Sequence, residues 1–534
     1  MAHQGIVNII NFIRAVEPRD ARIDLLEPIR QQIRLIQTHD LPATWLIQYD
    51  ALQDPRIVAL LKDQLDERQE IGIWFEVVQP LVEAIGSAWR GRFPWDWHSH
   101  VGFSIGYSPG ERRQMAERFM TDFKAQFGQY PHSVGSWLLD APLLAHLADH
   151  YDLSAGCICK DQWGTDGYSL WGGYYNQAFY PSRKNGFMPA QTAKAQIPLP
   201  LFRMLGSDPI DQYDAGLEAW TGDPSTSQHV ITLEPVYAEG TGAPGGGNPD
   251  WVRWFFKTNF GSPSLAFAYT QVGQENSFGW PAMAAGLEMQ IPLVAAGNGG
   301  AWRVETLETS GRWFKSRFST TPATAITALS DFRGQPRQSV WYNSRHYRLN
   351  AICENGAFSI RDIHRFDENY PERYLQNVCP TADCLYDTLP LLNGYHWSGP
   401  DGRARLRCLR LNADGHPLPH SGSGPLTVTE LDPSSLRIDW DTGDGESLEW
   451  QCRENTLEVA WRESPRQPRH WVLEMNWSDR IAIPLHRIEP QILTYRHAGY
   501  VYTWTCLKGH FEGWGNSALR LIPKDGRLIL RMDS

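Results

Sequence analysis

Cysteine is scarce in this chain, and no two cysteines are closely paired. Eight cysteines occur among 534 residues, and none forms a Cys-x-x-Cys motif. Their low density argues against a disulfide scaffold, so we expect buried thiols. Long apolar runs are missing too. No window approaches 18 consecutive apolar residues, which excludes a transmembrane helix.

Basic residues are outnumbered by acidic ones. The chain has 49 Lys and Arg against 60 Asp and Glu, a formal net charge of −11. This balance repels nucleic-acid backbones and anionic membranes, so neither is an expected partner. The remaining composition, 42% hydrophobic and 20% charged, is that of a soluble globular protein of two or three domains.

The N-terminus has neither the basic region nor the small-residue cleavage site of a signal peptide. It runs directly into an apolar stretch, residues 6–13, which is typical of a first strand. The sequence therefore predicts a cytoplasmic protein, or one from which a leader has been removed.

Aromatic residues are in surplus, with 23 Trp, 20 Tyr and 21 Phe. Flat apolar rings with a polar edge suit the faces of sugars. A large hydrophobic core accounts for such rings equally well, so composition leaves both interpretations open.

The first 330 residues alternate short apolar runs with amphipathic helical patterns. The predicted strands are residues 6–13, 42–47, 70–77, 133–139, 155–159, 229–233 and 265–269. Strands separated by helices imply a parallel sheet. We therefore predict an α/β fold with a seven-stranded (β/α) barrel as the catalytic domain, residues 1–330. Two long aromatic loops, residues 89–109 and 161–214, follow predicted strands and are expected at the catalytic mouth of the barrel.

The pattern changes near residue 338. Short runs, many of them alternating, are separated there by turn residues such as Asp444 and Gly445. This is typical of an antiparallel arrangement. We therefore predict a C-terminal β-sandwich domain, residues 331–534.

Three segments resemble the polysaccharide deacetylase superfamily, whose fold is shared by glycoside hydrolase families 38 and 57. They are Leu-Pro-Ala-Thr-Trp-Leu at 41–46, Glu-Ile-Gly-Ile-Trp-Phe-Glu-Val-Val-Gln-Pro at 70–80, and residues 128–140. This resemblance implies a deacetylase-like barrel. The whole chain also resembles a bacterial family with a barrel followed by a β-domain, through motifs at residues 11–19, 95–100, 160–168 and 202–209. The second resemblance implies a sugar enzyme without naming its substrate.

The resemblance to deacetylases does not extend to their metal site. Those enzymes use an Asp from strand one and two His from strand three to hold a divalent cation. Here strand one runs into Arg14 without an Asp, and strand three offers Trp74 and Gln79 where the His would fall. We therefore expect no metal and no other cofactor.

Acidic residues follow most of the predicted barrel strands. Glycoside hydrolysis needs two carboxylates across the scissile bond, and neighbouring strand ends can supply them. Glu76 and Asp140 form the first candidate catalytic pair, with Asp161 and Glu234 next. The structural alternative for Glu76 is a salt bridge, and for Asp140 it is the N-cap of a helix containing Pro142. For Glu234 it is an ion pair or a hydrogen bond to a ligand.

The remaining candidates are side chains expected to bind substrate at the same rim. They are Arg14, Asp50, Trp74, Trp95, His98, His100, Trp137, Gln162, Trp163, Asp166, Arg203, Asp208 and Glu275. The tryptophans suit stacking on sugars, with core packing as the alternative. The arginines suit clamping an acidic sugar or pairing with rim carboxylates. The two histidines could bind zinc, but their spacing places no third ligand, so hydrogen bonds to sugar hydroxyls or loop packing are favoured.

Together these observations favour a metal-independent glycoside hydrolase that cleaves an oligo- or polysaccharide. One alternative is a non-catalytic carbohydrate-binding protein that keeps the barrel. The other is a metal-dependent carbohydrate deacetylase with a rearranged site around His98 and His100. The expected partner is a carbohydrate substrate, and a homodimer is one option for the assembly.

Overall fold

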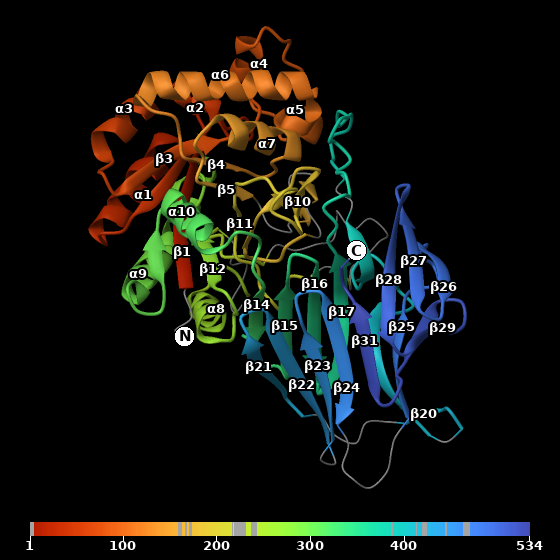
Figure 1. The fold of residues 1–534 in the computed structure, drawn as a ribbon. Coiled ribbons are helices and arrows are strands. Elements are labelled where there is room, and N and C mark those ends of the chain that lie inside the picture. Colours follow the sequence, from red (N-terminus) through yellow and green to blue (C-terminus); the bar gives the residue numbers. More distant parts are fainter. Residues whose placement is uncertain are drawn as a thin grey trace.

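The computed structural model describes most of the chain. The described residues are 5–158, 163–165, 168–169, 173–215, 217, 231–236, 243–385, 388–412, 414–418, 424–443, 446–462 and 470–533. Within these ranges the N-terminal part forms a helix-flanked sheet, and the C-terminal part forms two large antiparallel sheets (Figure 1).

The N-terminal sheet has nine strands within the described ranges, with the order β12-β1-β2-β3-β4-β5-β11-β8 and β13 beside β1. The strands from β12 to β11 run parallel: β12 (Ala268–Val272), β1 (Gly5–Ile13), β2 (Ala43–Ile47), β3 (Gln69–Trp74), β4 (Ser133–Ser136), β5 (Ala155–Ile158) and β11 (Leu201–Arg203). β13 (Arg303–Glu305) pairs parallel with β1, and β8 (Ala178–Phe179) pairs antiparallel with β11. This arrangement agrees with the predicted α/β class and a barrel-like sheet. The predicted count of seven strands is not confirmed.

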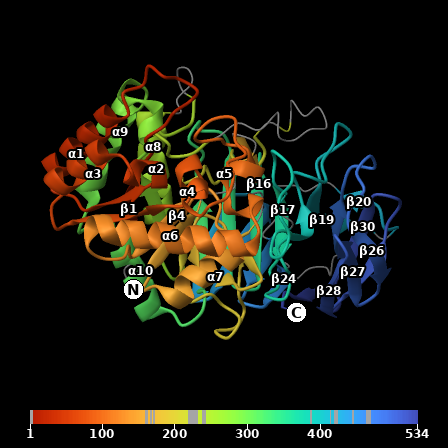
Figure 2. The same cartoon turned by 90° about the horizontal axis from the view of Figure 1, so that it is seen from above.

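Helices flank the outside of this barrel-like sheet. They are α1 (Leu26–Thr38), α3 (Pro55–Gln64), α6 (Pro109–Phe127), α7 (Ala141–His150), α8 (Pro249–Gly261), α9 (Trp280–Gly297) and α10 (Leu307–Arg317). Seen from above, α1 and α9 lie on one side of the strands and α6 and α7 on the other (Figure 2). All nine residues of β1 are buried, as expected for a barrel strand whose inner face meets other strand side chains and whose outer face is covered by helices.

Local sequence explains where several helices begin. Ser108 and Glu111 form a capping box at the start of α6, and Gly128 ends that helix in the left-handed conformation. Asp54 caps α3 through the backbone N–H of Arg56. These two helices therefore begin where their sequences supply a capping side chain.

The first C-terminal sheet has ten strands within the described ranges. They are β14 (Thr324–Ala328), β15 (Arg337–Asn343), β16 (Tyr347–Glu354), β17 (Ala357–Arg365), β18 (Leu389–Asn393), β19 (Arg405–Leu411), β20 (Pro417–Leu418), β25 (His470–Asn476), β29 (His510–Gly513) and β30 (Ala518–Ile522). β14 begins this sheet six residues before the predicted domain boundary after residue 330, and the boundary itself stays a prediction.

The second C-terminal sheet has eight strands within the same ranges. They are β21 (Leu426–Asp432), β22 (Ser435–Gly443), β23 (Glu446–Cys452), β24 (Thr456–Arg462), β26 (Leu485–Glu489), β27 (Ile492–His497), β28 (Tyr500–Lys508) and β31 (Arg527–Arg531). The two sheets touch where Phe358 of the first stacks against Trp440 and Trp450 of the second, at ring-centroid distances of 5.7 Å and 5.6 Å. Antiparallel pairing throughout agrees with the prediction for this half of the chain.

A long segment between β17 and β18, residues 366–385, reaches back to the N-terminal part. Figure 1 shows it rising from the antiparallel sheets toward α5 (Ser99–Gly102). The backbone N–H of Ser99 donates to the carbonyl of Ala382 at 2.6 Å, and that of Cys379 donates to Ile105 at 2.8 Å. The two halves of the chain therefore share a hydrogen-bonded border.

None of the helices in the described ranges combines the length and the apolar character that a membrane crossing requires.

Candidate active site

Four side chains come from the carboxyl ends of neighbouring parallel strands. Arg14 directly follows β1, Gln48 follows β2, Glu76 lies two residues after β3, and Glu275 lies three residues after β12. Because parallel strands end at one edge of the sheet, these side chains converge there. In (β/α) barrels this edge is where catalytic groups collect.

Arg14 joins two carboxylates at this edge. Its Nη2 lies 2.9 Å from Oε2 of Glu76 and 3.2 Å from Oε2 of Glu275. Both oxygens contact the same nitrogen, so they are separated by at most about 6.1 Å, the two distances laid end to end. The amide of Gln48 also donates to Oε2 of Glu76, at 2.8 Å. One guanidinium and one amide therefore fix the spacing of two acids.

The two carboxylates are almost completely shielded from water. Glu76 is 1% exposed and Glu275 is 2% exposed. Burial raises the pKa of Glu76 to about 7; Arg14 opposes that rise, whereas the negative charge of Glu275 adds to it. Ser277 and Arg14 donate to Glu275. The two acids are thus both buried and both bound to Arg14.

Arg14 is itself held on several sides. The ring of Trp95 lies 4.0 Å from the guanidinium carbon, a cation–π contact. Asn276 accepts from the backbone N–H of Arg14 at 2.9 Å and donates to its carbonyl at 2.8 Å. Trp95 comes from the loop at residues 89–109, which pairs with the end of β3 through Val78. Arg14 is therefore a rigid cation.

Glu234 joins the same group through Gln274. Its Oε1 accepts from Nε2 of Gln274 at 3.3 Å, and its Oε2 accepts from Thr232 at 3.0 Å. The side chain of Gln274 in turn accepts from the backbone N–H of Glu275 at 2.8 Å. Glu234 is 2% exposed. We call Glu76, Glu275, Glu234 and Arg14 the carboxylate cluster.

Asp50 lies beside this cluster, in the short helix α2 (Tyr49–Leu52). It accepts from the backbone N–H of Ala15 at 3.1 Å, next to Arg14 in the chain, and from its own neighbour Ala51 at 2.7 Å. Burial raises the pKa of Asp50 to about 6. Its contacts are those of a group that fixes the backbone after β1.

Asp140 lies in a different set of contacts. It caps α7 through the backbone N–H of Leu143 at 3.1 Å, pairs with Arg112 at 3.1 Å, and accepts from Ser104. Both Asp140 and Arg112 are 0% exposed. Within the described ranges, the side chains that contact Asp140 are not those that contact Glu76. The two members of the first predicted pair therefore have separate contacts, and those of Asp140 are the ones that the capping alternative describes. A catalytic role for the pair stays a prediction.

Glu372, from the segment at residues 366–385, approaches Asp140 from the other half of the chain. It accepts from the backbone N–H groups of Ala141 at 3.0 Å and Gly186 at 2.9 Å. Burial, reinforced by the negative charge of Asp140, raises the pKa of Glu372 to about 8. Arg112 also donates to the carbonyl of Tyr374 in the same segment, at 2.9 Å.

Three of the predicted stacking tryptophans lie in the core: Trp74, Trp95 and Trp137. Trp74 is 0% exposed and stacks on Phe12 at 4.1 Å, with Trp137 edge-on to both rings. The core interpretation describes these packing contacts. Binding of sugars by the three tryptophans stays a prediction.

The other described candidates are dispersed around the rim. Nδ1 of His98 lies 2.9 Å from Asp96, and the rings of His98 and His100 are 5.9 Å apart. Arg203 is buried at the end of β11. Asp208 accepts from the indole N–H of Trp251 at 2.8 Å, and its burial raises its pKa to about 6.

Some predicted residues cannot be placed. Asp161, Gln162 and Asp166 lie outside the described residues, and Trp163 begins the short strand β6 (Trp163–Thr165).

Sequence reasoning missed Gln48, Gln274, Arg112 and Glu372. The first two lie at strand ends, so the rule that found Glu76 also contained the signal for them. Arg112 lies on the first turns of α6, and Glu372 lies in the other half of the chain. No local pattern links either of them to Asp140.

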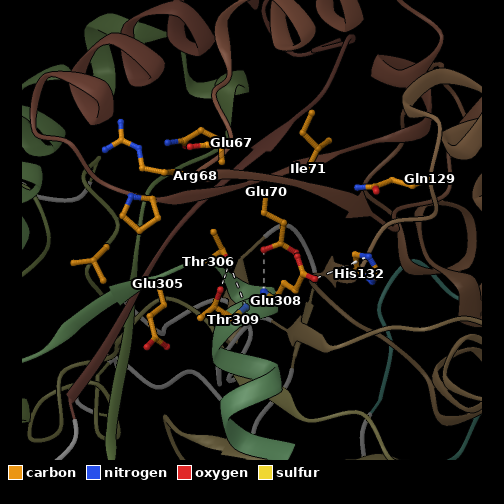
Figure 3. A pocket seen from close by; sticks show the side chains of 13 residues that line it. Glu67, Arg68, Glu70, Ile71, Gln129, His132, Glu305, Thr306, Glu308 and Thr309 are labelled. Carbon is orange, nitrogen blue, oxygen red and sulfur yellow. Dashed lines mark hydrogen bonds and ion pairs between the residues drawn. The ribbon is translucent and has the colours of Figure 1, made fainter.

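A pocket of about 520 Å³ lies at the opposite edge of the sheet (Figure 3). It is lined by Glu70 near the start of β3, by His132 just before β4, by Glu305 at the end of β13 and by Glu308 of α10. Glu70 accepts from the backbone N–H of Glu308 at 2.9 Å, and Glu308 lies 4.0 Å from His132. Because catalytic groups of barrels collect at the carboxyl ends, we place the candidate active site at the carboxylate cluster.

Comparison with known proteins shows the fold. No family model matches the chain, and no curated protein matches it. A structure from Parabacteroides distasonis, provisionally named a glycoside hydrolase/deacetylase, is 16% identical with a TM-score of 0.50, over 74% of this chain and 91% of that one. This likeness shows that the chain shares the fold of that structure, which is the kind of fold that the sequence resemblance implies.

Two further structures align less well. A protein from Mycobacterium smegmatis, provisionally named a polysaccharide deacetylase, is 12% identical with a TM-score of 0.35, over 59% of this chain and 92% of that one. A glycoside hydrolase family 57 branching enzyme from Thermococcus kodakaraensis is 9% identical with a TM-score of 0.30, over 60% of this chain and 72% of that one.

The residues at the ends of β1 and β3 do not fit the divalent cation that deacetylases hold there. The end of β1 carries Arg14, whose guanidinium already occupies the position between Glu76 and Glu275. Within the described ranges no group of three or more His, Cys, Asp or Glu could hold a metal ion, and that includes the surroundings of His98 and His100. A guanidinium and a divalent cation in contact with the same two carboxylates would repel each other.

Proposed function

We propose that this chain is a carbohydrate-active hydrolase, specifically a glycosidase, that uses Glu76 and Glu275 as its two catalytic carboxylates. The observation that carries the proposal is the shared contact with Arg14, which keeps two acids within about 6.1 Å of each other. Retaining glycosidases hold their carboxylates roughly 5–5.5 Å apart, and inverting ones roughly 6.5–9.5 Å apart. The short spacing favours the retaining mechanism.

The surroundings of the two acids suggest separate roles. Glu76, with its pKa raised to about 7, is suited to donate a proton to the glycosidic oxygen near neutral pH. Glu275, which accepts from Arg14 and Ser277, is suited to act as the nucleophile. Glu275 attacks the anomeric carbon while Glu76 protonates the leaving oxygen. Glu76 then deprotonates the water that releases the sugar from Glu275.

Arg14 holds the carboxylates of Glu76 and Glu275 at a fixed spacing for these steps. Its charge limits how far burial raises the pKa of Glu76, so that part of the population is still able to act as a base in the second step. Trp95, which covers Arg14, excludes water from the guanidinium. Both side chains are positioning residues in this mechanism.

Glu234 is the second choice for the nucleophile, because Gln274 links it to Glu275. Asp161 also remains a proposed catalytic residue. We assign Asp140 to the capping of α7 and to the ion pair with Arg112. In architectural terms, we propose that residues 1–330 act as a seven-stranded barrel unit and that the two antiparallel sheets of residues 331–534 form a sandwich.

A substrate screen tests the proposal. The wild-type protein, Glu76→Gln and the surface control Glu117→Gln are incubated with a panel of polysaccharides and aryl glycosides, and products are separated by chromatography. We expect new reducing ends with the wild type and the control, and a loss of about 100-fold or more with Glu76→Gln. Release of acetate instead of reducing ends, with sensitivity to chelators, would indicate a deacetylase. Binding without any product would indicate a carbohydrate-binding protein.

A further inference from the structure

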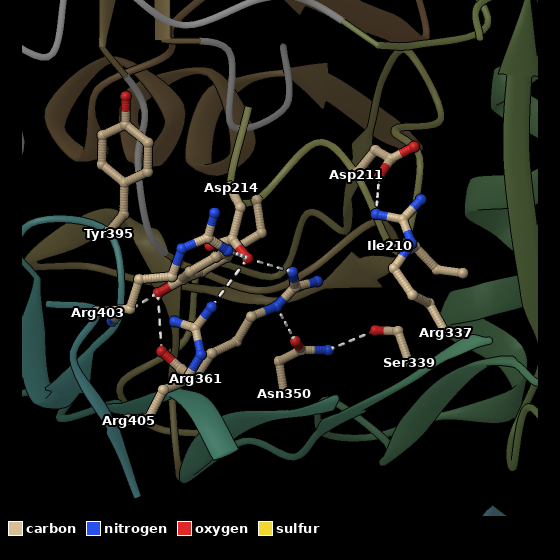
Figure 4. A network of polar contacts seen from close by, with 12 residues as sticks. Ile210, Asp211, Asp214, Arg337, Ser339, Asn350, Arg361, Tyr395, Arg403 and Arg405 are labelled. Carbon is tan, nitrogen blue, oxygen red and sulfur yellow. Dashed lines mark hydrogen bonds and ion pairs between the residues drawn. The ribbon is translucent and has the colours of Figure 1, made fainter. Parts of the chain in front are cut away.

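Three arginines converge on one carboxylate oxygen at the border between the two halves of the chain. Oδ2 of Asp214 lies 2.9 Å from Nη2 of Arg405, 3.1 Å from Nη1 of Arg361 and 3.5 Å from Nη1 of Arg403 (Figure 4). Asp214 lies in the segment after β11, whereas Arg361 belongs to β17 and Arg405 begins β19. We call the three basic residues the arginine cluster.

The arginine cluster carries more positive than negative charge. Three guanidiniums, which stay ionised at any physiological pH, meet the single carboxylate of Asp214. The nearby acid Asp211 is bound to Arg337 at 2.5 Å instead. Within the described residues, the contacts around Asp214 therefore leave two positive charges without an acidic partner.

Two of the three arginines in the cluster are shielded from water. The side chains of Arg361 and Arg405 are only 1% and 3% exposed. Keeping such groups ionised out of water costs free energy unless an anion balances them. Other N–H groups of Arg361 donate to the side chain of Asn350 and to the carbonyl of Pro209. Arg403, by contrast, has a side chain that is 45% exposed, and it contacts Asp214 at 3.5 Å.

The arginine cluster is connected to the segment that carries Glu234. The backbone N–H of Ile231 donates to the side chain of Gln212, two residues before Asp214, and Ser207 pairs with Thr232. Glu234 follows Thr232 by two residues and belongs to the carboxylate cluster. The segment that carries Glu234 is therefore hydrogen-bonded to the segment that carries Asp214.

We propose that the arginine cluster binds the carboxylate of a uronic acid residue in the substrate, so that the enzyme acts on acidic sugar chains. The inference rests on the proposed function for its link to hydrolysis. The planar guanidinium fork matches a carboxylate with two parallel hydrogen bonds. Asp214 already presents a carboxylate oxygen to all three arginines, which shows that their donors are arranged for this group.

Binding measured without turnover tests the inference. Calorimetry on the full chain compares oligogalacturonides, oligoglucuronides and oligomannuronides with their methyl esters, which keep the sugar and remove the charge. We expect the acid form of at least one series to bind and its ester to bind at least about tenfold more weakly. Arg403→Gln should weaken binding of the acid form by about tenfold or more. The matched control Arg253→Gln, an exposed arginine paired with Asp250, should bind as the wild type does.

Arg403→Lys guards against a folding defect, because it keeps the charge and loses the fork; we expect affinity between that of the wild type and Arg403→Gln. The inference is overturned if no uronate series binds, if acid and ester bind equally, or if Arg403→Gln binds as tightly as the wild type. Binding of sulfated sugars alone would overturn the assignment to a carboxylate. Hydrolysis of neutral glycans in the substrate screen would leave the proposed glycosidase intact while overturning this inference.

Discussion

Arg14 and Glu76 come from strands that are not neighbours, β1 and β3, yet Nη2 of Arg14 lies 2.9 Å from Oε2 of Glu76 with both side chains at most 2% exposed. The ion pair opposes the effect of burial, which by itself disfavours the ionised carboxylate. With a pKa of about 7, Glu76 is able both to donate and to accept a proton near neutral pH. This balance underlies the predictions about the carboxylate cluster.

Substitutions on the two sides of Glu76 should move its pKa in opposite directions. Arg14→Gln removes a favourable charge and should raise the pKa of Glu76 above about 7, whereas Glu275→Gln removes a repulsive charge and should lower it. Carbon-13 NMR of labelled glutamate carboxyls follows the titration, with Glu76→Gln identifying the signal. Shifts of the same sign in both variants would contradict the described cluster.

Asp140→Asn should destabilise the fold without removing a catalytic group. Asn is as good an N-cap as Asp, so the loss comes from leaving Arg112 buried without its carboxylate, at a cost of about 3–5 kcal/mol. Asp54→Asn is the matched control, since Asp54 caps α3 but its partner Arg56 is 72% exposed; its cost should stay below about 1 kcal/mol. Urea denaturation measures both. Wild-type stability of Asp140→Asn together with lost turnover would restore Asp140 as a catalytic candidate.

Glu372 should make stability depend on pH. The pKa of Glu372 is raised from the ordinary 4.5 to about 8 in the folded chain. Between these two pH values the folded chain keeps a proton on Glu372, whereas the unfolded chain releases it. The free energy of unfolding should therefore decline as the pH rises from about 4.5 to about 8. Denaturation of the wild type and Glu372→Gln at both ends of this range should give a smaller difference for the variant. An unchanged difference would mean that Glu372 is ionised in the folded chain.

Trp74→Ala should lower the stability of the fold without lowering the affinity for sugar. The ring is fully buried against Phe12, so its loss should cost about 3–5 kcal/mol. Trp97, which is only half-buried and stacks near Phe93 at 6.0 Å, serves as the comparison: Trp97→Ala should lower sugar affinity more than it lowers stability. Thermal denaturation and calorimetry separate the two effects, and the reverse pattern would place the sugar platform at Trp74.

Strand-end reasoning named several residues of the candidate site in advance because it uses only local pattern. Glu76, Glu275 and Arg14 each follow an apolar run, and the ends of parallel strands share an edge. Their mutual contacts could not be predicted, since strand order and side-chain direction are properties of the folded sheet. Gln48 has the same kind of position and was overlooked because an amide carries no charge to mark it.

Other residues show where local pattern fails. Asp140, two residues before Pro142, is typical of a helix N-cap and is also placed like a catalytic acid at a strand end. The sequence around it does not show the ion pair with the distant Arg112, which favours the structural role. The burial of Trp74 depends on Phe12 and Trp137, which are more than 60 residues away in each direction. Glu372 and Ala141 are in contact although 231 residues separate them in the sequence, and no local pattern in either segment predicts this contact.

The most direct test of the account is to trap the sugar on the enzyme. A 2-fluoro glycoside of the sugar identified in the substrate screen slows release of a covalent intermediate, and mass spectrometry of the digested protein locates the adduct. The account predicts an adduct on Glu275 that forms in the wild type and in Glu117→Gln. An adduct on another carboxylate, or turnover of the substrate with inversion and no adduct, would contradict the pairing of Glu76 with Glu275.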